Sequence, residues 1–252
     1  MTIRLSSRQP LIPIPHRTVR QKSSKIIFIS CEGVVTEEEY FRILSEKIFD
    51  GIANKIQFIS VRDEFLSTPK NMRTREQVDE QNKSTPRQVM NRITSFKQKQ
   101  ENDNLYKFDE NLDDEFWLVI DVDDHTDTAH IDEFNLVISE CERLNYRLAV
   151  TNPFFEFWLY LHHCEVVDKD KSNANTVNNP YFKNKMRDNA GVKLSGTNHK
   201  KPLEKDYNID KIKTAIQRAK ELHTDKYEKW PNILGSHVYF LVDKFIELSK
   251  DS

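Results

Sequence analysis

Four short apolar segments, each followed by a stretch with helical periodicity, constrain the fold of this chain more than any other feature of its sequence. The apolar segments span residues 26–31, 56–61, 116–120 and 147–150. Residues 26–31 and 116–120 are short, nearly continuous apolar runs, which are typical of strands that are covered on both faces of a parallel sheet. Strands that alternate with helices are joined by right-handed crossovers. We therefore predict an α/β fold with a mostly parallel sheet of about four strands, flanked by helices.

Local signals place the helices between these strands. Thr36 with Glu39, and Thr85-Pro86 with Gln88, have the spacing of a capping box at a helix start. Further helices are predicted from residue 129, from the segment 151–153 onward, and over residues 209–222 and 237–248. The last two form a C-terminal helical extension of the predicted α/β fold.

The charge pattern divides the chain into three parts. Residues 1–24 contain basic residues and prolines but no acid, so we expect a flexible, extended arm. Residues 25–165 contain the alternating strands and helices of the core. Residues 166–252 begin as an irregular polar insertion and end in the two helices, which we expect to pack on the core. A polar stretch at residues 62–84 is predicted to be a long loop.

Composition excludes several classes of protein. The three cysteines, at positions 31, 141 and 164, lack any C-x-x-C spacing, which favours a reducing, cytoplasmic compartment. No apolar run reaches the roughly 18–20 residues that cross a bilayer, so we expect no membrane partner. The chain has 38 basic and 40 acidic residues, but they are unevenly placed, so a nucleic-acid partner is not excluded. There are only 5 glycines and no P-loop motif for ATP.

Acidic residues follow three of the predicted strands. Glu32 comes after the first strand, Asp121 and Asp123 follow the third, and Glu156 lies in the helix after the fourth. The carboxyl ends of parallel strands meet at one side of the sheet, here called the carboxyl edge. Convergent carboxylates suit Mg²⁺, because this cation prefers oxygen ligands and offsets the repulsion between like charges. Each acid alone also fits a solvated turn, a loop cap or a helix-dipole contact.

Other polar residues near these acids leave alternatives open. Either Asp123 or Asp124 can form a metal-binding pair with Asp121. His125 can be a ligand, a base or a solvated loop residue. His162 and His163 follow an apolar helix face. We expect them to mark the solvent edge of that helix rather than to bind a metal.

Three blocks of sequence, in this order, resemble the RloB family, which is related to the abortive-infection protein AbiLii. The blocks are residues 29–41, 119–123 and 149–159. The family's usual Ser-Asn-Pro sequence is here Thr151-Asn152-Pro153, which keeps the hydroxyl group. The resemblance covers residues 25–164 well and the last helix more loosely. It implies a variant of the Toprim fold.

The Toprim pattern supplies a glutamate after its first strand and an Asp-x-Asp motif after a later one. The resemblance places the glutamate at Glu32 and the aspartates at Asp121 and Asp123, in preference to Asp121 with Asp124. It implies that these acids hold Mg²⁺, or Mn²⁺, against a phosphodiester. Glu32 would act as general acid or base, or as a further metal ligand.

The resemblance further implies a metal-dependent nuclease that cleaves DNA or an RNA such as tRNA. It would be the effector of an anti-phage abortive-infection system with an ABC-type ATPase partner. Asn152 and Glu156 are expected to orient or complete the site, and basic residues such as Lys201 to contact phosphates. Two alternatives stay open: a non-catalytic protein that regulates the ATPase, and nucleotidyl or phosphoryl transfer. Assembly into a homo-oligomer is open as well.

Overall fold

The computed structural model of the chain describes most of the region in which strands and helices were predicted. The described residues are 25–33, 35–59, 85–103, 108, 114–122, 128–173, 192–195, 199–225 and 227–250. For residues 128–130, 172–173, 192–195 and 199–201 the description is limited to the backbone. The predicted basic arm (1–24) and the polar loop predicted at 62–84 lie outside the described residues.

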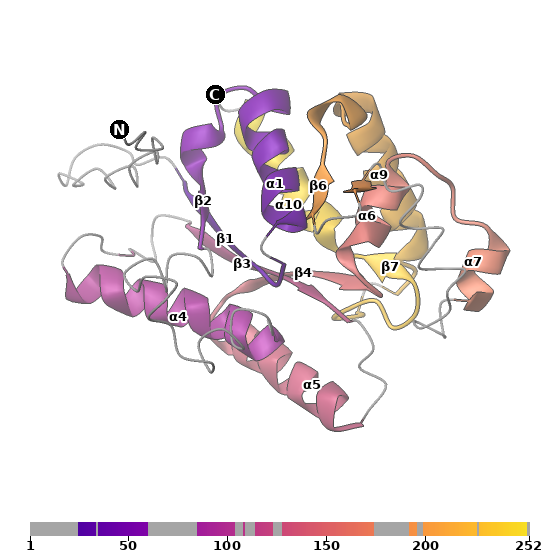
Figure 1. Cartoon of the computed structure of the whole chain (residues 1–252). Coiled ribbons are helices and arrows are strands. Elements are labelled where there is room, and N and C mark those ends of the chain that lie inside the picture. Colours follow the sequence, from indigo (N-terminus) through magenta and orange to yellow (C-terminus); the bar gives the residue numbers. More distant parts are fainter. Residues whose placement is uncertain are drawn as a thin grey trace, which may run out of the picture.

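A five-stranded, mostly parallel sheet forms the centre of the molecule, in the order β2-β1-β3-β4-β7 (Figure 1). The strands are β1 (Ile27–Cys31), β2 (Ile56–Phe58), β3 (Glu115–Asp121), β4 (Arg147–Asn152) and β7 (Gly235–Ser236). The first four are parallel, whereas β7 runs antiparallel to β4. The predicted α/β class and mostly parallel sheet are therefore confirmed, with one short strand more than the sequence indicated.

Helices cover both faces of this sheet, as Figure 1 shows. One face carries α4 (Pro86–Asn102) and α5 (Thr128–Arg143). The other face carries α1 (Thr36–Ile43), α6 (Phe155–Leu161), α9 (Ile209–Leu222) and α10 (Val238–Lys250). Side chains alternate along β1. Ile27 and Ile29 therefore pack on the face covered by α1, α6, α9 and α10, and Phe28 packs on the face covered by α4 and α5. Burial on both faces explains why β1 and β3 appear in the sequence as nearly continuous apolar runs.

The two predicted capping boxes have different outcomes. Thr85 caps α4: its hydroxyl accepts from Gln88 N, and the Gln88 side chain accepts from Thr85 N at 2.9 Å. Thr36, however, is already the first residue of α1, and its predicted box with Glu39 is wrong because Val35 takes the capping position without a side-chain bond. After Ile43 the chain continues as a π-helical turn, η1 (Leu44–Ile48), and a short η2 (Ala53–Lys55) leads into β2.

The C-terminal part of the chain contains more regular structure than the predicted irregular insertion. It contains α7 (Asp168–Asn173), the antiparallel pair β5 (Val192–Ser195) and β6 (His199–Pro202), and η5 (Glu204–Asp206). Helix α9 has the predicted bounds, and the last helix begins one residue later than predicted and extends to Lys250. Among the residues described, no helix combines the length and apolarity needed to cross a bilayer.

Candidate functional site

The ends of β1 and β3 bring Glu32 and Asp121 together at the carboxyl edge. Glu32 N donates to Val119 O of β3 at 2.9 Å, so the residue after β1 stays in line with the neighbouring strand. The Glu32 carboxylate then accepts a hydrogen bond from Asp121 N through Oε2 at 3.0 Å. By covalent geometry, the two carboxylates are less than about 8 Å apart. A carboxylate oxygen has two lone pairs, so this hydrogen bond does not prevent it from binding a metal as well.

Arg92 of α4 supplies a positive charge next to these acids. Its side chain is buried, at 5% exposure, and Nη1 donates to Cys31 O, the last carbonyl of β1, at 2.8 Å. Burial raises the pKa of the Cys31 thiol well above its ordinary value, and the negative charges of Glu37 and Glu38 raise it further. The Arg92 charge opposes that rise in the pKa. Acids and the buried Arg92 thus lie around the end of β1, although neither Arg92 nor Glu37 was predicted to belong to the site.

Glu37 is a further acid near this edge. It is only 6% exposed, and its Oε1 accepts from Gly33 N at 3.1 Å. A Cβ atom added at Gly33 would overlap the same carboxylate, so glycine at this position leaves room for it. The run of three glutamates after Thr36 was the signal available in the sequence, but the capping-box interpretation used Glu39 instead.

The end of β4 places Asn152 next to the loop that precedes β7. Val122 N donates to Thr151 O at 2.9 Å, which joins the chain after β3 to β4. The Asn152 amide is buried and donates through Nδ2 to Pro231 O at 2.8 Å. This bond fixes the loop before β7 to the strand end. Glu156 is buried in the first turn of α6, which follows β4, as the sequence predicted for its position.

Several predicted site residues cannot be placed. Asp123, Asp124 and His125 lie outside the described residues, so the Asp-x-Asp motif is described at its first acid alone. Lys201 belongs to β6, and only the backbone of this residue is described. The choice between Asp123 and Asp124 as the partner of Asp121 therefore stays a prediction.

His162 does not lie at the solvent edge of its helix, and that expectation is wrong. Its ring is 3% exposed, with Nε2 3.0 Å from the Tyr40 hydroxyl and Nδ1 3.0 Å from Trp158 O. Burial lowers the pKa of His162 to about 3. His163 is partly buried, and burial lowers its pKa as well. His162 is a hydrogen-bonded core residue, packed among aromatic rings.

The described geometry suits a hard divalent cation. Glu32 and Asp121 share the carboxyl edge, and oxygen ligands of this kind are those that Mg²⁺ and Mn²⁺ prefer. Ligands of open α/β sheets generally bind outside the carboxyl ends of the strands. Glu32 and Asp121 can therefore contribute oxygen ligands to such a cation at this edge.

Comparison with known proteins identifies a family. The family model described as RloB-like protein matches residues 27–245, which is most of the chain. Neither a curated protein nor a solved structure matches. The matched residues contain all five strands of the central sheet, together with Glu32, Asp121 and Asn152.

Proposed function

The chain belongs to the RloB-like family, and from this membership we propose that it is a metal-dependent nuclease. It hydrolyses phosphodiester bonds in DNA or in an RNA such as tRNA. The observation that carries the proposal is the hydrogen bond from Asp121 N to Glu32 Oε2 at the carboxyl edge. That contact supports the Toprim-like pairing of a glutamate after the first strand with an aspartate after a later one.

Asp121 and Asp123 would hold Mg²⁺, or Mn²⁺, with Glu32 as a further ligand or as the general acid or base. The bound ion would stabilise negative charge on the phosphate and lower the pKa of a water molecule. The chain's own groups position the glutamate: Asp121 N holds one of its oxygens, and Arg92 holds the carbonyl of the preceding residue. Asn152 and Glu156 would orient or complete the site, and Lys201 would contact phosphates of the substrate.

The test is a cleavage assay of the purified full chain on DNA and on tRNA, with Mg²⁺ or Mn²⁺. Glu32→Gln keeps an oxygen that can accept from Asp121 N, so the fold should persist while acid–base function is lost. We expect cleavage to fall by about 10²–10⁴-fold in this variant, and at least as far in Asp121→Asn. Glu46→Gln is the matched control, because Glu46 pairs with Arg42 at 3.6 Å on an exposed part of η1. Equal cleavage by all four proteins would contradict the proposed roles.

The same assay separates the alternatives. Incorporation of nucleotides in place of strand cutting would support nucleotidyl transfer. A wild-type chain that neither cuts nor binds Mg²⁺ by calorimetry would support a non-catalytic, regulatory protein. Asp123→Ala should then leave binding of the ATPase partner unchanged.

The proposed biological setting is anti-phage defence by abortive infection, with an ABC-type ATPase as partner. The sequence has no P-loop motif, so ATP hydrolysis would come from that partner. Co-expression with such an ATPase, followed by size-exclusion chromatography, tests the association. Phage infection of cells that carry Glu32→Gln tests whether the carboxyl edge is needed for defence.

A further inference from the structure

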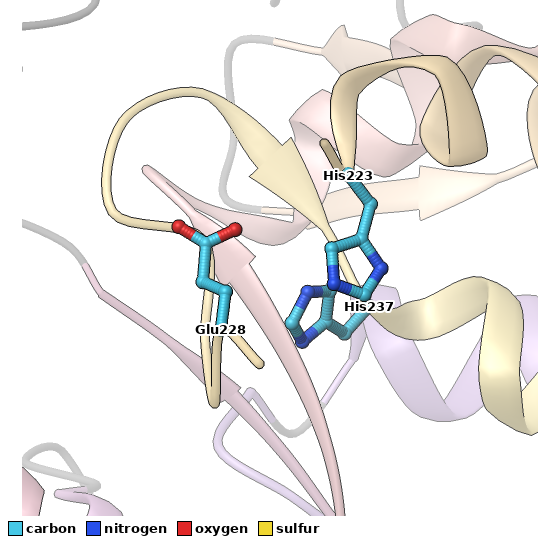
Figure 2. A group of neighbouring side chains, drawn as sticks. All are labelled: His223, Glu228 and His237. Carbon is cyan, nitrogen blue, oxygen red and sulfur yellow. The ribbon is translucent and has the colours of Figure 1, made fainter. Parts of the chain in front are cut away.

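Two histidines and a glutamate lie together next to β7. His223 directly follows α9, His237 joins β7 to α10, and Glu228 belongs to the loop between them. Each offers one ligand atom, and the three atoms lie within 4.8 Å of one another. The two imidazole rings are neighbours, with centroids 4.5 Å apart, and Glu228 lies beside them (Figure 2).

Both histidines present a buried nitrogen that lacks a partner. Within the described part of the chain, neither His223 Nε2 nor His237 Nε2 makes a hydrogen bond, and both atoms are screened from solvent. The His237 side chain as a whole is 3% exposed. A buried polar atom without a partner costs about 1–3 kcal/mol, and native structures contain few of them. Two such atoms on adjacent rings indicate that a ligand belongs between them.

Hydrogen bonds elsewhere in the group hold these residues in place. His223 Nδ1 lies 2.7 Å from the Tyr239 hydroxyl, and the backbone N–H of His237 donates to Val150 O at 2.7 Å. Glu228 Oε1 accepts from Asn232 N at 2.7 Å. A metal-binding histidine typically donates its second ring N–H to such a group, which fixes the ring and its tautomer.

We propose that His223, Glu228 and His237 bind one Zn²⁺ ion. Two imidazole nitrogens and one carboxylate oxygen suit zinc, which takes three protein ligands and leaves a fourth position for water. Mg²⁺ favours oxygen ligands alone, so this site differs in chemistry from the carboxyl edge. Ligand atoms in a tetrahedral zinc site lie about 3.3 Å apart, so atoms now within 4.8 Å need only small side-chain rotations to bind the ion. The ion would join the end of α9, the following loop and the start of α10.

The test measures Zn²⁺ binding to the full chain after treatment with a chelator and desalting. Competition with a chromophoric chelator should give one ion per chain with a submicromolar dissociation constant. Co²⁺ in the same site should give the intense visible absorption of a four-coordinate ion. Either absence of binding, or a stoichiometry well below one, overturns the proposal.

Variants identify the ligands. Glu228→Gln retains an acceptor for Asn232 N but loses the charged ligand, and His223→Ala removes one nitrogen, so each should weaken Zn²⁺ binding by more than about 100-fold. Tyr239→Phe should weaken it by about 10–100-fold through the lost hydrogen bond to His223. Glu221→Gln, on the exposed last turn of α9, is the matched control and should bind normally.

A further variant separates this site from the carboxyl edge. The double variant Glu32→Gln/Asp121→Asn should keep full Zn²⁺ affinity, whether or not the chain is a nuclease. Loss of Zn²⁺ binding in this double variant, with normal binding in Glu228→Gln, would place the ion at the carboxyl edge and overturn the proposal.

Discussion

Lowering the pH should destabilise the folded chain through His162, because the fold holds this ring in its neutral form. Burial lowers the pKa of His162 to about 3, compared with 6.5 for an exposed histidine. Below pH 6.5 the unfolded chain therefore binds a proton at His162, whereas the folded chain does not bind this proton until the pH approaches 3. The stability that depends on neutral His162 is fully present above pH 6.5 and is lost as the pH falls toward 3. With about 1.4 kcal/mol per pH unit, the loss between pH 7.5 and 5.0 is about 2 kcal/mol.

The assay compares the free energy of unfolding in urea for wild type and His162→Gln at pH 7.5 and 5.0. Glutamine stays neutral at both values and has an amide oxygen that can accept from the Tyr40 hydroxyl, as His162 Nε2 does. Burial also lowers the pKa of His237, to about 4, so only the difference between the two proteins isolates His162. A chelator removes any metal-linked proton binding. The wild type should lose about 2 kcal/mol more than the variant, and an equal loss in both proteins would refute the reasoning.

Three further predictions concern other parts of the fold. Thr85→Ala removes the cap of α4 and should lower the free energy of unfolding by about 1 kcal/mol in urea, with Thr85→Ser as control. Arg92→Met removes the charged donor to Cys31 O and should cost about 2–3 kcal/mol by the same measurement, and a cost near zero would contradict its structural role. Native protein should react with a thiol reagent first at the partly exposed Cys164, since Cys31 and Cys141 are buried and burial raises the pKa of Cys141 to about 12; equal rates at all three would contradict this.

The strands and most helix starts were predictable because burial on both faces leaves a direct trace in the sequence. Residues 26–31 and 116–120 are continuous apolar runs, and each proved to be a central strand. Thr85 and Gln88 carry both halves of a capping box, a signal that depends on neighbouring residues alone. Such local signals need no knowledge of the rest of the fold.

Features that depend on distant partners left little trace. Strand β7 consists of Gly235 and Ser236, residue types that disfavour strands, and it forms by pairing with β4. The burial of His162 depends on Tyr40, which is 122 positions away in the chain. In the sequence, a histidine after an apolar helix face looks like a residue at the solvent-exposed end of the helix unless that partner is known.

The same difference between local signals and distant partners applies to the candidate site. Glu32 directly follows β1 and Asp121 is the last residue of β3, so the rule that parallel strands end together was enough to predict their shared edge. Arg92 reaches that edge from a helix on one face of the sheet, and no sequence spacing connects it with Cys31, 61 positions earlier. Likewise, His223, Glu228 and His237 have no recognised metal-site spacing, and the turn of the chain between α9 and β7 brings them together.

The segment from His223 to His237 contains the proposed zinc ligands, and its described bonds to β4 lie within residues 231–237. This arrangement predicts where metal binding should change the dynamics. His237 N donates to Val150 O at 2.7 Å, and the Thr151 and Ser236 hydroxyls are 2.9 Å apart. The Asn152 amide holds Pro231 O as well. These bonds fix residues 231–237 without any ion.

Zn²⁺ should therefore slow hydrogen exchange mainly at residues 227–230, around Glu228, and leave β4 and β7 nearly unchanged. Tyr227 N and Glu228 N donate to Asp225 within the same loop rather than to the sheet. Local opening is easiest where the chain is not bonded to the sheet, so the added ligand has most effect there. Exchange measured by mass spectrometry with and without Zn²⁺ tests this, with Glu228→Gln as the control that should show no change. Protection confined to β4 and β7, or equal protection in Glu228→Gln, would mean that the ion acts elsewhere in the chain.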